Sequence, residues 1–202
     1  RNMRKVPFPH YLGKETVANN VRRGYPGDPN EFRTIGFFSV ESGDLNLLDI
    51  PSPTANRVAG FSWSQSGKLL LDQESDSATD RWLYTVDPTD GRLKEIWHDH
   101  RDTRIYTSIA SAWHSDGKRV VFLSDLNDRY GLYLLTPGKE NPDLLTNESF
   151  DVTSAPLISE SANRIFFQSN EPSPYERHVF YIPDEGGVST RVSSIPGQHR
   201  PY

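Results

Sequence analysis

The sequence predicts an all-β fold made of repeated four-stranded units. Two observations lead to this prediction. Short runs rich in β-branched and aromatic residues alternate with Gly-, Asp- and Pro-containing turns, and these runs recur at a period of 44–50 residues. In addition, no window of 11 or more residues carries the apolar stripe of an amphipathic helix.

The first repeated element is an apolar strand, a tight turn and a second apolar strand. It spans 61–71, recurs fifty residues later at 111–122, and returns in a degraded form at 156–167. Gly67 and Gly117 fall at the corner of the first two turns, where a hairpin needs positive φ. We therefore assign these two glycines a structural role in the turns.

The second repeated element is an aromatic-rich strand that keeps step with the first. It lies at 82–86, 131–135 and 178–182, and a fourth relative lies upstream at 35–40. A single four-stranded sheet cannot bury both of its faces, so repeated sheets of this kind pack face to face around an axis. The matched offsets thus predict a β-propeller with about four antiparallel blades, and a β-sandwich with accidental similarity is the alternative.

The chain divides into a lead-in and a repeat region. Residues 1–32 contain several prolines and glycines and are predicted to be irregular, with one edge strand conceivable at 11–17. Residues 33–202 are predicted to form the blades. After 191–194 the repeat would require a further strand and turn, so we expect the last blade to be incomplete.

Composition excludes several classes of protein. The 202 residues include no cysteine, which rules out a disulfide framework, a thiolate zinc site and a cysteine nucleophile. The net charge is −5 and basic residues are scattered, which argues against a nucleic-acid partner. Apolar runs are too short to span a membrane. We expect no cofactor and no metal, and cysteine usage does not indicate the cellular compartment.

A serine nucleophile is not predicted. The stretch 60–64 approaches the Gly-x-Ser-x-Gly motif around Ser62, but its last position is serine and no helix follows. The equivalent of Ser62 in the next repeat is Ala112. Because no nucleophile, base and orienting group come together, the sequence predicts a chain without catalytic residues.

Other polar clusters are interpreted as solvated. His98 and His100, two residues apart on a strand, would point to one side and could bind a metal, but no motif places a third ligand, so we predict a solvated connector between blades. The stretch 125–131 resembles a calcium loop but lacks the oxygen ligand at its fifth position. The triplet 147–149 is a glycosylation acceptor only in a chain secreted from a eukaryotic cell.

Two carboxylate pairs fall in predicted loops and turns. They are Glu74 with Asp76 and Asp184 with Glu185, and solvation is the plain explanation of both. An autonomous hydrolase that uses a carboxylate pair is a minor alternative.

The repeat Trp-x-Ser-Asp-Gly-Lys-x-x-x-Phe at 113–122 resembles that of TolB-type propellers and of prolyl oligopeptidase-family serine peptidases. The order of 6–9, 25–30 and 35–40 is similar to the N-terminal region of the dipeptidyl peptidase IV family. The similarity continues to Tyr181 and so covers almost the whole chain, at the level of motifs.

This resemblance implies the second half of an eight-bladed propeller. In such peptidases the propeller covers the active site and filters peptide substrates, while the catalytic serine, aspartate and histidine belong to a hydrolase domain that would follow Tyr202. The peptide substrate would thus be a partner of this chain only through that hydrolase domain. The family's paired glutamates, which bind the substrate's amino terminus, are absent here. A free-standing TolB-like propeller acting as a protein-interaction scaffold is the alternative.

The resemblance also points to one substrate-pocket pair. In the family an aromatic residue and an arginine line the pocket just before the strand equivalent to 111–113. Tyr106 matches the aromatic residue, whereas Thr107 stands at the arginine position and Arg104 lies nearby. A half-propeller would also expose the apolar faces of its first and last blades, so we expect self-association.

Overall fold

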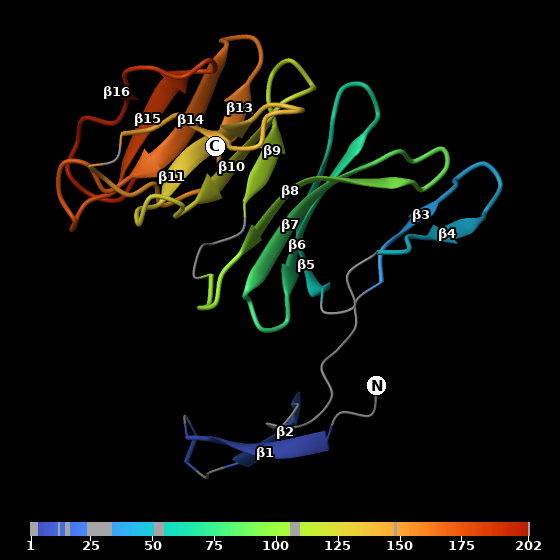
Figure 1. The fold of residues 1–202 in the computed structure, drawn as a ribbon. Coiled ribbons are helices and arrows are strands. Elements are labelled where there is room, and N and C mark those ends of the chain that lie inside the picture. Colours follow the sequence, from blue (N-terminus) through green and yellow to red (C-terminus); the bar gives the residue numbers. More distant parts are fainter. Residues whose placement is uncertain are drawn as a thin grey trace. The chain divides into compact units, whose positions relative to one another are not determined.

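A computed structural model describes residues 4–11, 13–14, 17–23, 34–50, 55–105, 110–147 and 149–201. The chain forms two compact units, Arg1–Arg33 and Thr34–Tyr202. Every regular element in the described ranges is a β-strand, so the all-β prediction is confirmed (Figure 1). Accordingly, the described residues include no helix long and apolar enough to cross a membrane.

The first unit contains an antiparallel hairpin. Strand β1 (Arg4–His10) pairs with β2 (Val17–Arg23) over their full lengths. Within the described residues the lead-in, predicted to be irregular with an edge strand at 11–17, thus contains two paired strands at 4–10 and 17–23. Pro7 and Pro9 are compatible with β1 because residues two apart direct their backbone nitrogens to the same edge, and a two-stranded sheet leaves one edge of each strand without a partner.

In the described residues of the second unit, a two-stranded sheet is followed by three four-stranded sheets, here named blades 1 to 3. The two-stranded sheet pairs β3 (Gly36–Phe38) with β4 (Leu45–Leu47). Blade 1 consists of β5 (Ala55–Trp63), β6 (Leu69–Ser75), β7 (Asp80–Val86) and β8 (Leu93–His100). Blade 2 consists of β9 (Ser111–Trp113), β10 (Val120–Ser124), β11 (Gly131–Leu135) and β12 (Asp143–Leu144). Blade 3 consists of β13 (Leu157–Ser159), β14 (Arg164–Ser169), β15 (His178–Pro183) and β16 (Thr190–Arg191).

The position of the incomplete blade differs from the prediction. The last blade was expected to be incomplete, yet β16 supplies its fourth strand by pairing with Phe180 and Tyr181. The two-stranded sheet is instead the first one, at 36–47, where the upstream relative of the repeat lies. Strand β16 escapes sequence detection because it has two residues, both exposed and polar.

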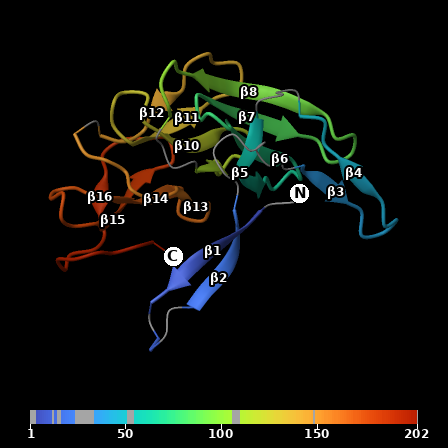
Figure 2. The ribbon, with the colours of Figure 1, turned by 90° about the horizontal axis from the view of Figure 1, so that it is seen from below.

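The three blades are arranged as in a propeller. Within each blade the strands lie side by side in chain order, and the first strands of neighbouring blades are in contact: β9 touches both β5 and β13. The indole nitrogen of Trp113 in β9 donates a hydrogen bond to the carbonyl of Ser62 in β5, at 3.2 Å. Figure 2 shows the blades succeeding one another in chain order, with these first strands toward a common side.

Strand β10 contributes side chains to two separate hydrophobic clusters, one on each of its faces. All five of its residues are buried. Val120 and Phe122 pack with side chains of blade 1, whereas Val121 and Leu123 pack with side chains of blade 3. Because successive side chains of a strand point to opposite faces, a strand between two blades buries both faces, and β10 is apolar at Val120, Val121, Phe122 and Leu123. The continuous apolar runs of the sequence are therefore central strands covered on both faces.

The turn glycines have the backbone conformation that a hairpin corner requires. Gly67 has a φ of +78° and Gly117 a φ of +64°. In both turns the glycine N–H donates to the carbonyl three residues earlier, that of Ser64 at 3.0 Å and that of His114 at 2.9 Å.

We expect Gly117→Ala to lower the free energy of unfolding by about 1–2 kcal/mol, because an L-residue with a Cβ is strained at positive φ. Urea denaturation measures this loss. Gly60→Ala is the matched control, since a Cβ there also meets open space but the φ of Gly60 lies outside the left-handed region. Equal losses for the two variants would contradict the prediction.

Candidate functional site

The predicted substrate-pocket pair is only partly described. Arg104 lies in the connection after β8 and is exposed, while its neighbour Ile105 is buried. Tyr106 lies outside the described residues. The pair therefore remains a prediction.

The hydroxyl of Ser62 is not arranged as a nucleophile. Ser62 lies in β5 opposite Leu70, and its Oγ is buried with no hydrogen-bond partner in the described part of the chain. A serine becomes nucleophilic when an adjacent base accepts its proton. This geometry agrees with a strand position for Ser62.

The carboxylate pairs are not simply solvated, which corrects the sequence-based interpretation. Glu74 belongs to β6 and is buried, whereas Asp76 is exposed in the following turn. Asp184 and Glu185 both have protein partners on the neighbouring blade. The calcium-like loop is also engaged, since Asp125 forms an ion pair with Arg101 at 2.8 Å.

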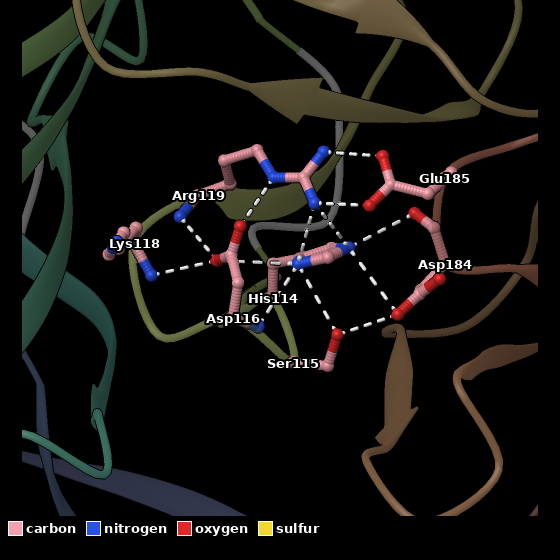
Figure 3. Close-up of polar contacts among 7 residues, drawn as sticks. All are labelled: His114, Ser115, Asp116, Lys118, Arg119, Asp184 and Glu185. Carbon is pink, nitrogen blue, oxygen red and sulfur yellow. Dashed lines mark hydrogen bonds and ion pairs between the residues drawn. The ribbon is translucent and has the colours of Figure 1, made fainter.

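A polar network joins the β9–β10 turn of blade 2 to the β15–β16 turn of blade 3 (Figure 3). We call it the inter-blade clamp; it consists of His114, Ser115, Asp116, Arg119, Asp184 and Glu185. The hairpin itself orients the first part of the clamp. The Asp116 carboxylate accepts the backbone N–H groups of Lys118 and Arg119, at 2.8 and 2.9 Å, which fixes the turn from within.

Arg119 is the centre of the clamp. Its Nε donates to Asp116 at 2.6 Å, and its two terminal nitrogens donate to the two carboxylate oxygens of Glu185, at 2.7 and 2.5 Å. The guanidinium thus forms a two-pronged contact with Glu185 across the blade boundary, the strongest geometry for such a pair. Beside it, Ser115 donates to the Asp184 carboxylate at 2.6 Å.

The clamp shifts the ionisation of its carboxyl groups. Partial burial raises the pKa of Asp116. Hydrogen bonds from the backbone N–H groups of Arg119 and Lys118 and from the Arg119 side chain together lower this pKa by more than burial raises it, so the pKa of Asp116 lies below its ordinary value. The hydrogen bonds from Arg119 likewise lower the pKa of Glu185, and Glu185 in turn raises the pKa of Arg119. Both carboxylates are therefore ionised at neutral pH.

The clamp contains a serine, a histidine and an aspartate, but not in a catalytic order. The Ser115 hydroxyl donates to Asp184 at 2.6 Å and lies 3.4 Å from Nδ1 of His114. A catalytic serine gives its proton to the imidazole, and the aspartate orients that imidazole from its other nitrogen. Because Ser115 is bound to the carboxylate instead, the clamp has the chemistry of a structural joint.

We expect Arg119→Gln to cost about 1 kcal/mol of unfolding free energy at pH 7, the size of a partly exposed ion pair, and less at pH 3. Both carboxyl pKa values are depressed in the folded chain, so their stabilisation is present above the usual carboxyl pKa of about 4 and is lost as the pH falls toward the folded values. Urea denaturation at both pH values measures the effect.

Arg92→Gln is the control for this substitution, because Arg92 lies 3.6 Å from Asp90 on an exposed turn. A cost of Arg119→Gln that is constant or grows on acidification would refute the role of the ionised clamp.

A second link between blades is buried. Arg81 of β7 makes hydrogen bonds with both oxygens of Asp72 in β6, at 3.0 and 2.8 Å, and its remaining nitrogen donates to the carbonyl of Leu123 in blade 2 at 2.6 Å. Both charged side chains are at most 1% exposed. No sequence motif indicates this pair. Asp72 and Arg81 become partners only because the register of β6 and β7 brings them together.

His98 and His100 do not lie in a connector, which corrects the sequence-based prediction. Both belong to β8, and both rings contact the carboxylate of Asp80 on β7. The third group was missed because it is 18 and 20 residues away in sequence and is brought alongside by the β7–β8 hairpin.

Comparison with known proteins identifies the family. A family model described as the dipeptidyl peptidase IV (DPP IV) N-terminal region matches residues 1–202. The chain belongs to this family. The resemblance found in the sequence is thereby confirmed. A curated relative of the DPP IV N-terminal region, a probable dipeptidyl-aminopeptidase B of Talaromyces marneffei, is 24% identical over 196 residues, which covers 88% of this chain and 22% of the relative.

Solved structures agree on the fold of this DPP IV N-terminal region. Porphyromonas gingivalis dipeptidyl peptidase 4 superposes with a TM-score of 0.75 at 17% identity, over 97% of this chain and 28% of that one. A putative dipeptidyl aminopeptidase IV from Bacteroides ovatus gives 0.70 at 14% identity, over 93% and 29%. The chain spans less than a third of each of these relatives, and its blades are those of a DPP IV propeller region.

Proposed function

We propose that this chain forms part of a propeller that covers the active site of a DPP IV-like serine peptidase and filters its peptide substrates. The observation that carries the proposal is the family match over residues 1–202, combined with relatives that are named as peptidases and are several times longer. The chain then contributes a wall of the enclosure, and the catalytic groups belong to another part of the protein.

The inter-blade contacts support a filtering role. A wall excludes bulky substrates only if its blades keep their relative positions. Arg119 with Glu185 and Arg81 with the Leu123 carbonyl each tie neighbouring blades together. The clamp lies at the turns, where the edges of adjacent blades could otherwise separate.

The experiment uses the full-length protein that contains this chain. It compares kcat/KM for a short chromogenic dipeptide substrate and for a long polypeptide with the same amino-terminal dipeptide. We expect Arg119→Gln to raise the relative rate on the long polypeptide severalfold and to leave the short substrate unaffected. Arg92→Gln, on an exposed turn of blade 1, is the control. An unchanged ratio would refute the filter, and absence of peptidase activity in the full-length protein would refute the family role.

The exposed apolar residues support packing against further parts of the propeller. On the two-stranded sheet, Phe38 and Leu45 form a cross-strand pair and are 64% and 60% exposed. On blade 3, Leu157, Val192 and Ile195 are exposed as well. In a complete ring, neighbouring blades would cover such surfaces.

We therefore expect the isolated chain to self-associate. Sedimentation velocity at ~100 µM, well above the dissociation constant of a typical weak interface, should show dimers or larger species. The double variant Phe38→Glu/Leu45→Lys places charges on the exposed apolar pair and should shift the distribution toward monomer. A clean monomer of the unsubstituted chain would contradict the expectation.

A further inference from the structure

Asp80, His98 and His100 bring three metal-ligating atoms together at one end of blade 1. Oδ1 of Asp80 lies 3.0 Å from Nε2 of His98 and 2.7 Å from Nδ1 of His100. The three ligand atoms all lie within 4.8 Å of one another. Two imidazole nitrogens and a carboxylate oxygen are a donor set suited to Zn²⁺ and its neighbours in the transition series.

The backbone explains why these groups converge. Asp80 is paired directly with His100 across the β7–β8 ladder, and His98 is two residues earlier on β8, opposite Trp82. Directly paired residues and residues two apart share one face of a sheet. The three side chains therefore meet on one face of two hydrogen-bonded strands, a rigid base for a binding site.

Neighbouring groups fix two of the three side chains. The hydroxyl of Thr79 donates to Oδ2 of Asp80 at 2.8 Å, which leaves Oδ1 directed at the histidines. The ring of His98 stacks on Trp82, with centroids 5.0 Å apart and planes 11° from parallel. Hydrogen bonds and packing of this kind orient the ligands of metal sites in general.

The two distances from Asp80 Oδ1 require only small movements to receive an ion. Tetrahedral zinc with bonds of about 2.0–2.1 Å holds its ligand atoms about 3.3 Å from one another. The present distances of 3.0 and 2.7 Å from the shared Oδ1 would each open by a few tenths of an ångström. Both histidines are partly exposed, His98 at 38% and His100 at 59%, so an ion can enter from solvent.

The charge around the cluster favours a cation. Asp102 lies close enough to His100 to act on it electrostatically and adds negative charge, whereas the charge of Asp99 is balanced by its ion pair with Arg101 at 2.8 Å. A second cluster in the described residues, one histidine and two carboxylates at His114, Asp184 and Glu185, differs because the Arg119 guanidinium already binds Glu185 and neutralises it. Among the described residues, the Asp80 cluster is thus the better candidate for a metal.

We propose that Asp80, His98 and His100 form a binding site for a divalent transition-metal ion such as Zn²⁺, with solvent completing the coordination. The ion would join β7 to β8 beside the β6–β7 turn. Such a crosslink between strands that are already paired would stiffen the outer edge of blade 1.

The test is titration of the metal-free chain with Zn²⁺ alone in a calorimeter, followed by Co²⁺ alone with detection of its visible absorption. We expect one ion per chain. His98→Gln, His100→Gln and Asp80→Asn should each weaken Zn²⁺ binding about tenfold or more. His199→Gln removes a histidine on blade 3 and should leave the affinity unchanged. Equal affinity in the unsubstituted chain and the His98→Gln/His100→Gln variant would overturn the proposal.

A second measurement uses the unsubstituted chain alone, so it does not require any variant to fold. Zn²⁺ added to the unsubstituted chain should shift the imidazole NMR signals of His98 and His100 and leave those of His178 and His199 in place. Shifts confined to other histidines, or no shift at ~1 mM Zn²⁺, where even weak sites with millimolar dissociation constants are half-filled, would overturn the site.

Discussion

Asp72→Ala should lower the free energy of unfolding by about 3–5 kcal/mol, because removing one member of a buried ion pair leaves the other charge buried and uncompensated. Asp72 is fully buried, and its carboxylate is the charged partner of Arg81, whose guanidinium is equally inaccessible to water. Arg81 cannot move its charge to solvent without breaking its contact with the Leu123 carbonyl. Urea denaturation at fixed chain concentration gives the loss.

Two further variants make this prediction specific. Asp90→Ala removes a carboxylate whose partner, Arg92, is 83% exposed, and it should cost well under about 1 kcal/mol. The double variant Asp72→Leu/Arg81→Met removes both charges of this pair and should recover much of the loss. A double variant as unstable as Asp72→Ala would show that the loss arises from packing, and not from the unpaired arginine.

Phe122→Ala should cost about 3–5 kcal/mol as well, since it opens a cavity in a core that cannot collapse to fill it. Phe122 is fully buried between blades 1 and 2. Its ring lies 4.6 Å from that of Trp97 and 5.9 Å from that of Tyr133, and Arg81 sits over its face at 5.4 Å. The substitution therefore weakens the joint between two blades as well as the blade that carries it.

Phe61→Ala is the matched control, because Phe61 lies on β5 and is 69% exposed. Truncating an exposed ring should change the unfolding free energy by about 0.5 kcal/mol or less. Phe122→Leu, which keeps most of the volume, should fall between the two. Similar losses for Phe61→Ala and Phe122→Ala would mean that blades 1 and 2 do not pack as described.

The central strands could be predicted from the sequence, whereas the marginal ones could not. Strand β10 and the first half of β6 could be recognised because burial on two faces favours consecutive apolar residues, as in Val120–Leu123 and Leu69–Leu71. Strand β16 is two exposed residues whose pairing is decided by β15. The β1–β2 hairpin was missed because its prolines disfavour strands in general, although a two-stranded sheet tolerates them on its open edges.

The polar sites, in contrast to the central strands, could not be predicted from the sequence. Arg119 and Glu185 are 66 residues apart, and nothing local in either turn indicates that blades 2 and 3 bring them together. Asp80 joins His98 and His100 only through the ladder of β7 and β8. Such contacts depend on register and blade packing, which a pattern of apolar and polar residues does not specify at the level of single side chains.

The amino-acid sequence by itself determined the all-β class, the repeated four-stranded unit and the family of this chain, because periodic burial and turn chemistry are local properties written into every repeat. Only the tertiary structure decided which charges are buried as pairs, which turns are clamped together and where two histidines meet a carboxylate. Those arrangements arise when one blade is placed against the next, and their energies depend on a few tenths of an ångström that no local pattern encodes.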